Sequence, residues 1–269
     1  MAYDKLVDSA QLDATFKGIA DAIRANTGIT EKISQDDMAE KIPGVYESGK
    51  ADGIEQGKES EYDRFWDIFQ NNGNRTDYTS AFGVCWTDEL FKPKYDVVPV
   101  GQCNQMFAAT SIKNLASCIA EAGIAFDMSN ATNTNYMFNN ATELEEVPNI
   151  NLSKSKTISY LFNACKALKK VSLTLAENTV TSYTSVFAGC SSLEELTISG
   201  VIDIPLSFSS SSKLTKASIE NIICALSTAT SGVTLTLSRI AVTNAFGSTT
   251  AEEWTSLIGT KPNWTINLA

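Results

Sequence analysis

Apolar residues in the middle of the chain recur in a fixed frame. The stretches "FNACKALKKVSL" (162–173) and "FAGCSSLEELTI" (187–198) place Phe, Cys, Leu and two aliphatic residues at the same relative positions, 25 residues apart. The last aliphatic residues of each stretch alternate with Ser or Thr, which is typical of a short strand with one buried face. We therefore predict one strand in each unit, with the Phe filling the interior opposite that strand.

The frame extends in both directions from these two copies. Further copies begin at Phe82, Phe107, Phe138 and Phe208, with Ala or Ser in the Cys position of the last two. A period of about 20–30 residues with this spacing predicts a leucine-rich-repeat solenoid, whose units bury their apolar faces by stacking. The predicted fold class is α/β: a short solenoid of about five to six irregular repeats with a C-terminal cap, preceded by a small helical N-terminal region.

Helical periodicity predicts an insertion in one repeat. The interval from Phe107 to Phe138 is longer than the others, and it contains Ile112, Leu115 and Ile119 at helical spacing. Gly123 follows, where a left-handed residue commonly ends a helix. We predict a helix that ends at this glycine.

The last third of the chain is typical of a cap for the repeats. Residues 219–226 place Ile and Leu on one helical face, and residues 233–238 alternate as a strand does. A capping box that begins at Thr250 predicts a helix through Ile258, and residues 263–268 predict a final strand.

The first 75 residues follow a different pattern. An amphipathic helix ending at Gly28 is predicted from four apolar residues, and a second short helix follows at 34–42; the four residues are Leu12, Phe16, Ile19 and Ile23. The predicted organisation is a helical attachment region (1–45), a linker or helix with an aromatic N-terminal cap (46–75), the solenoid (76–227) and the C-terminal cap (228–269).

Glycines at every fourth position precede the aromatic cap. Gly49, Gly53 and Gly57 each cost an isolated helix about 1 kcal/mol relative to Ala, so the segment is either a close helical contact between copies or a loose linker. The aromatic residues behind them are expected to pack onto the first repeat rather than bind a ligand: Tyr62, Phe65, Trp66 and Phe69.

Composition excludes several classes of chemistry. The formal net charge is −10, which disfavours binding to nucleic acid because phosphate neutralisation requires the opposite sign. The absence of histidine excludes Ser-His-Asp and Cys-His catalysis and HExxH zinc sites. The six cysteines form no CxxC pair, so we expect reduced, buried thiols, no metal and no cofactor. No apolar run approaches the ~20 residues of a membrane-spanning helix, and the N-terminus lacks the pattern of a secretory signal.

The repeats resemble the BspA-type leucine-rich repeats of gut bacteria and their phages. The whole chain is also similar to tail-associated leucine-rich-repeat proteins of phages and prophages of Firmicutes. This similarity lies in "QLDATFKGIADAIRANTG", "SEYDRFWDIFQNNGNRTDYTSAFGVCWTDELFKPKYD" and "EEWTSLIGTKPNWTI". The first stretch is similar to segments that precede many tail and appendage domains. The resemblance implies attachment to a virion, and it implies a location better than a ligand.

Three functions are compatible with these features. The first is a virion structural protein of tail-fibre type, made in the bacterial cytoplasm, which docks on other tail proteins as a homo-oligomer, with a trimer favoured, and presents the repeats to a glycan or protein receptor. The second is a bacterial surface or secreted adhesin. The third, glycan hydrolysis, is disfavoured because adjacent acids such as Glu145 and Glu146, or Glu194 and Glu195, point to opposite faces of a strand.

The outward positions of two neighbouring predicted strands are the candidate recognition surface. They carry small hydroxyl side chains able to bind a sugar or a protein loop, although any exposed strand can carry such residues: Ser172, Thr174, Thr197 and Ser199. Tyr136 and Tyr160 align two residues before the repeat Phe, and here packing along the edge is favoured over ligand stacking. Attachment and oligomer contacts are expected at the N-terminal apolar residues and glycines named above.

Overall fold

The computed structural model describes residues 66–67, 69–70, 75–84 and 86–269, and the chain divides into two compact units, residues 1–75 and 76–269. In the first unit, the ring of Trp66 meets Phe69 edge-on with centroids 6.1 Å apart. The predicted attachment residues lie outside the described residues: Leu12, Phe16, Ile19, Ile23, Gly49, Gly53 and Gly57.

The second unit combines short strands and helices. In chain order its elements are β1 (Gly101–Gln102), α4 (Leu115–Ala122), β2 (Ala131–Asn133), β3 (Ile150–Asn151), β4 (Lys170–Leu175), β5 (Glu195–Gly200), β6 (Leu206–Phe208), α5 (Lys216–Ala225), β7 (Val233–Leu237), α6 (Arg239–Phe246), α7 (Glu252–Gly259) and β8 (Trp264–Leu268). No helix in the described part of the chain is long and apolar enough to cross a bilayer.

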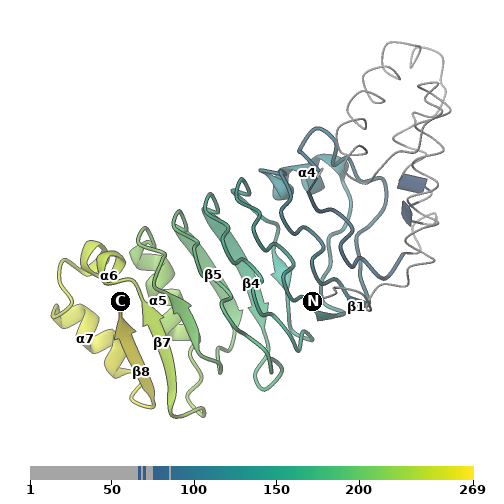
Figure 1. Cartoon of the computed structure of the whole chain (residues 1–269). Coiled ribbons are helices and arrows are strands. Elements are labelled where there is room, and N and C mark those ends of the chain that lie inside the picture. The colour runs from purple at the N-terminus through teal and green to yellow at the C-terminus, as the bar shows by residue number, and fades with distance from the viewer. Residues whose placement is uncertain (1–65, 68, 71–74, 85) are drawn as a thin grey trace, which may run out of the picture. The chain divides into compact units, whose positions relative to one another are not determined.

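The strands form three small parallel sheets, β1-β2, β3-β4-β5 and β6-β7-β8. Strands β4 and β5 lie side by side along the stack of chain turns (Figure 1), and their register joins Lys170 to Glu195 and Leu175 to Gly200. The predicted 25-residue interval is therefore the register of this pair. Single parallel bridges join further units at similar intervals, such as Thr157 to Ser182.

The repeat phenylalanines form a continuous column in the core. All six are fully or almost fully buried, as the sequence predicts: Phe82, Phe107, Phe138, Phe162, Phe187 and Phe208. Consecutive ring centroids lie 4.8–5.5 Å apart, and the rings of Phe138 and Phe162 are inclined by only 4°. Each ring thus contacts the ring of the unit before and the unit after.

The cysteine position of the repeat holds free, buried thiols, as predicted. The Cys165 Sγ donates to the carbonyl oxygen of Phe138 at 3.0 Å, and the Cys190 Sγ donates to that of Phe162 at 3.1 Å. Burial raises the pKa of Cys190 to about 12 and that of Cys165 well above its usual value. The position therefore uses a weak donor as well as small size.

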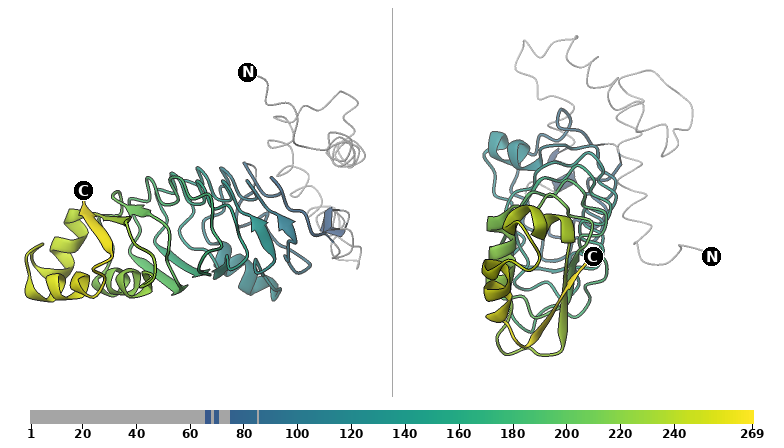
Figure 2. Two further views of the ribbon diagram at one scale, coloured as in Figure 1. Left: turned by 90° about the horizontal axis from the view of Figure 1, so that it is seen from below. Right: turned by 90° about the vertical axis from the view of Figure 1, so that its left-hand side faces the viewer.

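Several predicted elements are confirmed. Helix α4 ends at Gly123, which has the left-handed φ of 65°. Helix α5 buries Ile219, Ile222 and Ile223 on one face, and the predicted strands near the C-terminus are β7 and β8. Helices α4, α5, α6 and α7 lie along one long side of the second unit (Figure 2).

Two features of the C-terminal segment differ from the prediction. The Thr250 capping box is wrong: α7 has Ala251 at its N-cap with no side-chain cap, and the Thr250 hydroxyl bonds to Ser248 instead. The helix begins one residue too late for Thr250 to reach its free N–H groups. Helix α6 was not predicted, because its sequence buries only Ala241 and Val242 and carries little apolar periodicity.

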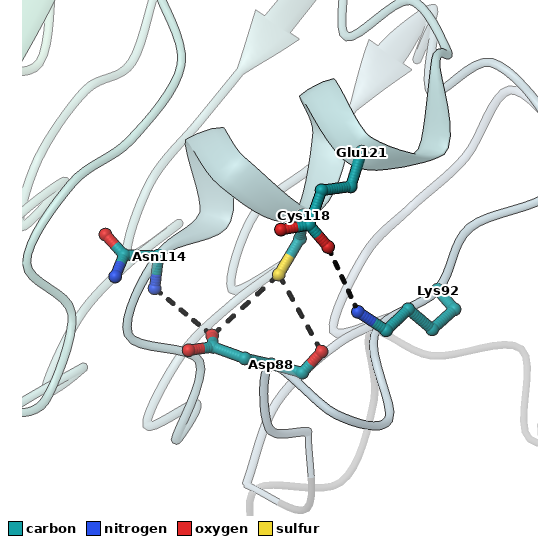
Figure 3. Close-up of polar contacts among 5 residues, drawn as sticks. All are labelled: Asp88, Lys92, Asn114, Cys118 and Glu121. Atoms are coloured by element: carbon teal, nitrogen blue, oxygen red, sulfur yellow. Dashed lines mark hydrogen bonds and ion pairs between the residues drawn. The ribbon is translucent and has the colours of Figure 1, made fainter.

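Side chains close the backbone ladder at its first rung. In later units, the paired N–H groups that precede each strand donate to one carbonyl of the previous unit, as those of Lys169 and Lys170 do to Glu145. In the first such rung, the Asp88 carboxylate replaces that carbonyl and accepts from the N–H groups of Lys113 (2.7 Å) and Asn114 (3.1 Å) (Figure 3). The Cys118 Sγ lies 3.9 Å from the same oxygen.

Candidate functional site

The four residues of the candidate recognition surface lie together on one sheet. Register pairs Ser172 with Thr197 and Thr174 with Ser199, so the hydroxyls form two rows across β4 and β5. Strand β3 extends the second row by placing Asn151 beside Thr174. Val171, Leu173, Leu196 and Ile198 point to the opposite, buried side of the sheet.

The rows differ in how much of their polar capacity the protein already uses. Thr197 and Ser199 are exposed, whereas Ser172 and Thr174 are half-buried. The Ser172 hydroxyl donates to Asn149 Oδ1 at 3.0 Å, which extends the first row by an exposed amide. The surface is flat, uncharged and built from groups that both donate and accept hydrogen bonds.

Helix α5 covers the open edge of this sheet. The Ser218 hydroxyl accepts the N–H of Leu196 at 2.9 Å, and Asn221 Oδ1 accepts the N–H of Ile198 at 2.7 Å. Side chains of a helix thus take the place of another strand, which removes an exposed edge that could pair with a second chain. The rows on β3, β4 and β5 therefore have a defined end at β5.

An open hollow with alternating charge adjoins the start of the strands. It is lined by Asn114, Glu145, Glu146, Lys169, Lys170, Glu194 and Glu195. The prediction that adjacent acids point to opposite faces is wrong here, because Glu145 and Glu194 lie in the turns that precede the strands. Lysines stand between the acids: Lys169 Nζ lies 2.6 Å from Glu145, and Lys170 Nζ lies 3.9 Å from Glu146 and 3.6 Å from Glu195.

These ion pairs keep their members charged. The hydrogen bond from Lys169 lowers the pKa of Glu145, and the same bond raises the pKa of Lys169. Both groups are fully exposed, so screening by solvent limits what the pair contributes to stability. A carboxylate held ionised in this way can attract a cation but is poorly suited to donate a proton at neutral pH.

Other side chains were examined for metal and redox chemistry. Within residues 75–84 and 86–269, no group of three or more Cys, Asp or Glu side chains is arranged to hold a metal ion. The thiol of Cys118 has its pKa raised to about 11 by burial and by the charge of Asp88. Its neighbours Lys92 and Glu121 pair with each other at 3.5 Å (Figure 3).

The aligned tyrosines stack, in agreement with the predicted packing along the edge. The rings of Tyr136 and Tyr160 lie 4.7 Å apart and are inclined by 8°. Sequence reasoning missed the backbone that positions them: residues two before and two after the repeat Phe adopt left-handed φ, as at Tyr160 (58°) and Ala164 (61°). Asn140 and Gly189 in the second of these positions are the signal that could have indicated it, because both residues tolerate this conformation.

Comparison with known proteins gives one match. The family model described as "Mycoplasma protein of unknown function, DUF285" matches residues 76–215. No curated protein and no solved structure matches the chain. The matched range contains the phenylalanine column, the strand face and the charged hollow.

Proposed function

Because the chain belongs to the DUF285 family, whose function is unknown, we propose its function from its own features. It is a structural protein of a phage tail, of the tail-fibre or receptor-binding type. Its N-terminal region attaches it to other tail proteins and to copies of itself, and its repeats form a leucine-rich-repeat solenoid that presents a surface to a bacterial receptor. The resemblance of the N-terminal and C-terminal stretches to tail proteins supports the location.

The strand face is the observation that carries the recognition role. The rows through Ser172 and Thr174 run in register across neighbouring strands, and Thr197 and Ser199 are exposed. Hydroxyls that face solvent contribute little to the stability of the sheet, so this face is free to bind. The charged hollow next to it is proposed to be structural rather than catalytic, since each carboxylate of Glu145 and Glu146 already pairs with a lysine.

Location is tested on particles. Phage particles released from the source bacterium would be purified and their proteins identified by mass spectrometry, with antibody labelling to find the chain on the particle. We expect several copies per tail. Recovery of the chain only in the cell-envelope or secreted fraction would instead support an adhesin and refute the tail assignment.

The recognition role is tested with substitutions that leave the core unchanged. The full chain carrying Thr197→Arg and Ser199→Arg is expected to lose binding to host cells in a pull-down assay. Thr265→Arg is the matched control, because Thr265 is also an exposed strand residue but lies on β8, in a different sheet. Equal loss in both variants, or in neither, would contradict recognition by this face.

A further inference from the structure

One outward position of the repeat carries tyrosine where the fold does not require it. Ser80, Gln105, Tyr136, Tyr160 and Ser185 lie two residues before their repeat Phe, and all five have φ between 52° and 58°. Three units thus adopt this conformation with a polar side chain. Left-handed φ costs an L-residue about 1–2 kcal/mol, and bulky side chains are rare there. The two tyrosines therefore occupy a backbone that disfavours them, which indicates a role beyond local structure.

The stacked pair presents an uncovered ring face. Tyr136 is exposed, with 38% of its surface accessible, and the ring of Tyr160 stacks on it. Because equivalent positions of successive units follow one another along the stack, the next place in this row belongs to Ser185. Its side chain ends at Oγ, so it cannot cover the outer face of Tyr160 as a third ring would.

Side-chain amides lie beside the rings. The N–H of Asn139 donates to the carbonyl of Tyr136 at 3.0 Å, and the N–H of Asn163 donates to that of Tyr160 at 3.2 Å. Each Tyr and Asn are therefore the two ends of one four-residue turn. Asn163 Nδ2 also donates to Asn139 Oδ1 at 2.9 Å, which aligns the amides in a ladder parallel to the rings.

This edge of the molecule carries no charge. Residues 128–142, 157–165 and 179–193 contain no Asp, Glu, Lys or Arg, although 19% of the whole chain is charged. Tyr, Ser and Asn dominate these segments, as they dominate antibody loops that combine rigid rings with adaptable hydrogen bonds. An acidic or basic ligand would find no counter-charge here, whereas a neutral sugar offers C–H groups to a ring face and hydroxyls to amides.

We propose that the edge formed by Tyr136, Tyr160, Asn139, Asn163 and Ser185 binds a neutral saccharide. One pyranose ring stacks on the outer face of Tyr160 above Ser185, and its hydroxyls bond to the Asn163 amide and the Ser185 hydroxyl. This site is separate from the rows on β4 and β5, and it does not depend on where the chain is located.

The test measures binding of the labelled full chain to an array of immobilised neutral and acidic oligosaccharides, followed by titration calorimetry with each neutral sugar that binds. Tyr160→Ser introduces the residue that the next unit carries at the same place, so it is expected to fold and to bind at least tenfold more weakly. Ser185→Tyr covers the ring face and is expected to weaken binding similarly. Thermal unfolding of both variants checks that the fold is kept.

Three results would overturn the proposal: no neutral saccharide bound, unchanged affinity in Tyr160→Ser, or binding confined to acidic sugars or to proteins. Thr197→Arg separates this site from the strand face, because it is expected to leave saccharide affinity unchanged. Loss of saccharide binding in that variant would place the sugar on the strands and refute the assignment to the tyrosine edge.

Discussion

The phenylalanine column predicts that energetic coupling between units is limited to nearest neighbours. Phe162 is fully buried between Phe138, with centroids 5.2 Å apart, and Phe187, at 5.5 Å. Truncation of such a residue to Ala costs about 3–5 kcal/mol, a large part of the 5–15 kcal/mol that stabilises a typical protein. Leucine is the better probe, since it keeps an apolar side chain and is expected to cost about 1.5 kcal/mol at each site.

Two double-mutant cycles separate the contact between neighbours from general weakening of the core. Phe138→Leu with Phe162→Leu removes one stacked pair, which is worth about 0.5–1.5 kcal/mol beyond burial, so the two losses are expected to be non-additive by that amount. Phe138→Leu with Phe187→Leu changes rings about 11 Å apart, and these losses are expected to add within about 0.5 kcal/mol.

The assay is urea unfolding of the full chain followed by far-UV circular dichroism, with the free energy of unfolding extrapolated to water. A coupling energy between Phe138 and Phe187 as large as that between Phe138 and Phe162 would refute the nearest-neighbour reasoning. Zero coupling in both cycles would equally show that the ring contacts add nothing beyond burial.

Three further changes test the caps and the thiols. Asp88→Ala removes the acceptor of two backbone N–H groups and is expected to lower the free energy of unfolding by about 1–3 kcal/mol, whereas Asp88→Asn, which keeps an oxygen, should lose less in the same urea titration. Lys261→Met leaves the carbonyls at the end of α5 without their buried donor and is expected to cost about 1–3 kcal/mol, against a negligible change for the exposed Lys213→Met. Burial raises the pKa of Cys103 and Cys190 from 9.0 to about 12, so stability that is complete below pH 9 should fall as the pH rises to 12, by up to about 1.4 kcal/mol per pH unit for each thiol. The double variant with Ala at both cysteines should show a shallower fall in unfolding titrations across that range, and an equal slope would contradict the assignment.

The periodic interior of the second unit could be read from the sequence because each unit repeats the same burial. Phe, Cys and Leu return every 24 or 25 residues through the central units, and a position buried in one unit is buried in the next, as at Leu168 and Leu193. The helix ending at Gly123 could be predicted for a related reason, since both its apolar spacing and its terminating glycine are local signals.

Contacts between units could not be read in the same way. The role of Asp88 as a substitute carbonyl and of Ser218 and Asn221 as a substitute strand depends on the last turn of the stack on each side, which no local pattern specifies. The charged hollow was misjudged because the alternation rule was applied to Glu145 and Glu194, which precede the strands rather than lie within them. Each miss concerns the place where one regular element gives way to another.

Alternating charge explains how repeats with similar apolar frames keep one register. Acidic residues at 145 and 146 are followed by lysines at 169 and 170 and by acids at 194 and 195, so each pair faces opposite charges in both neighbouring units. A slip by one whole unit would preserve most aliphatic contacts, but it would place like charges together. Although each exposed pair contributes little stability by itself, repulsion along the row disfavours the wrong stacking, and the same row therefore fixes the alignment of the hydroxyl rows on the adjoining strand face.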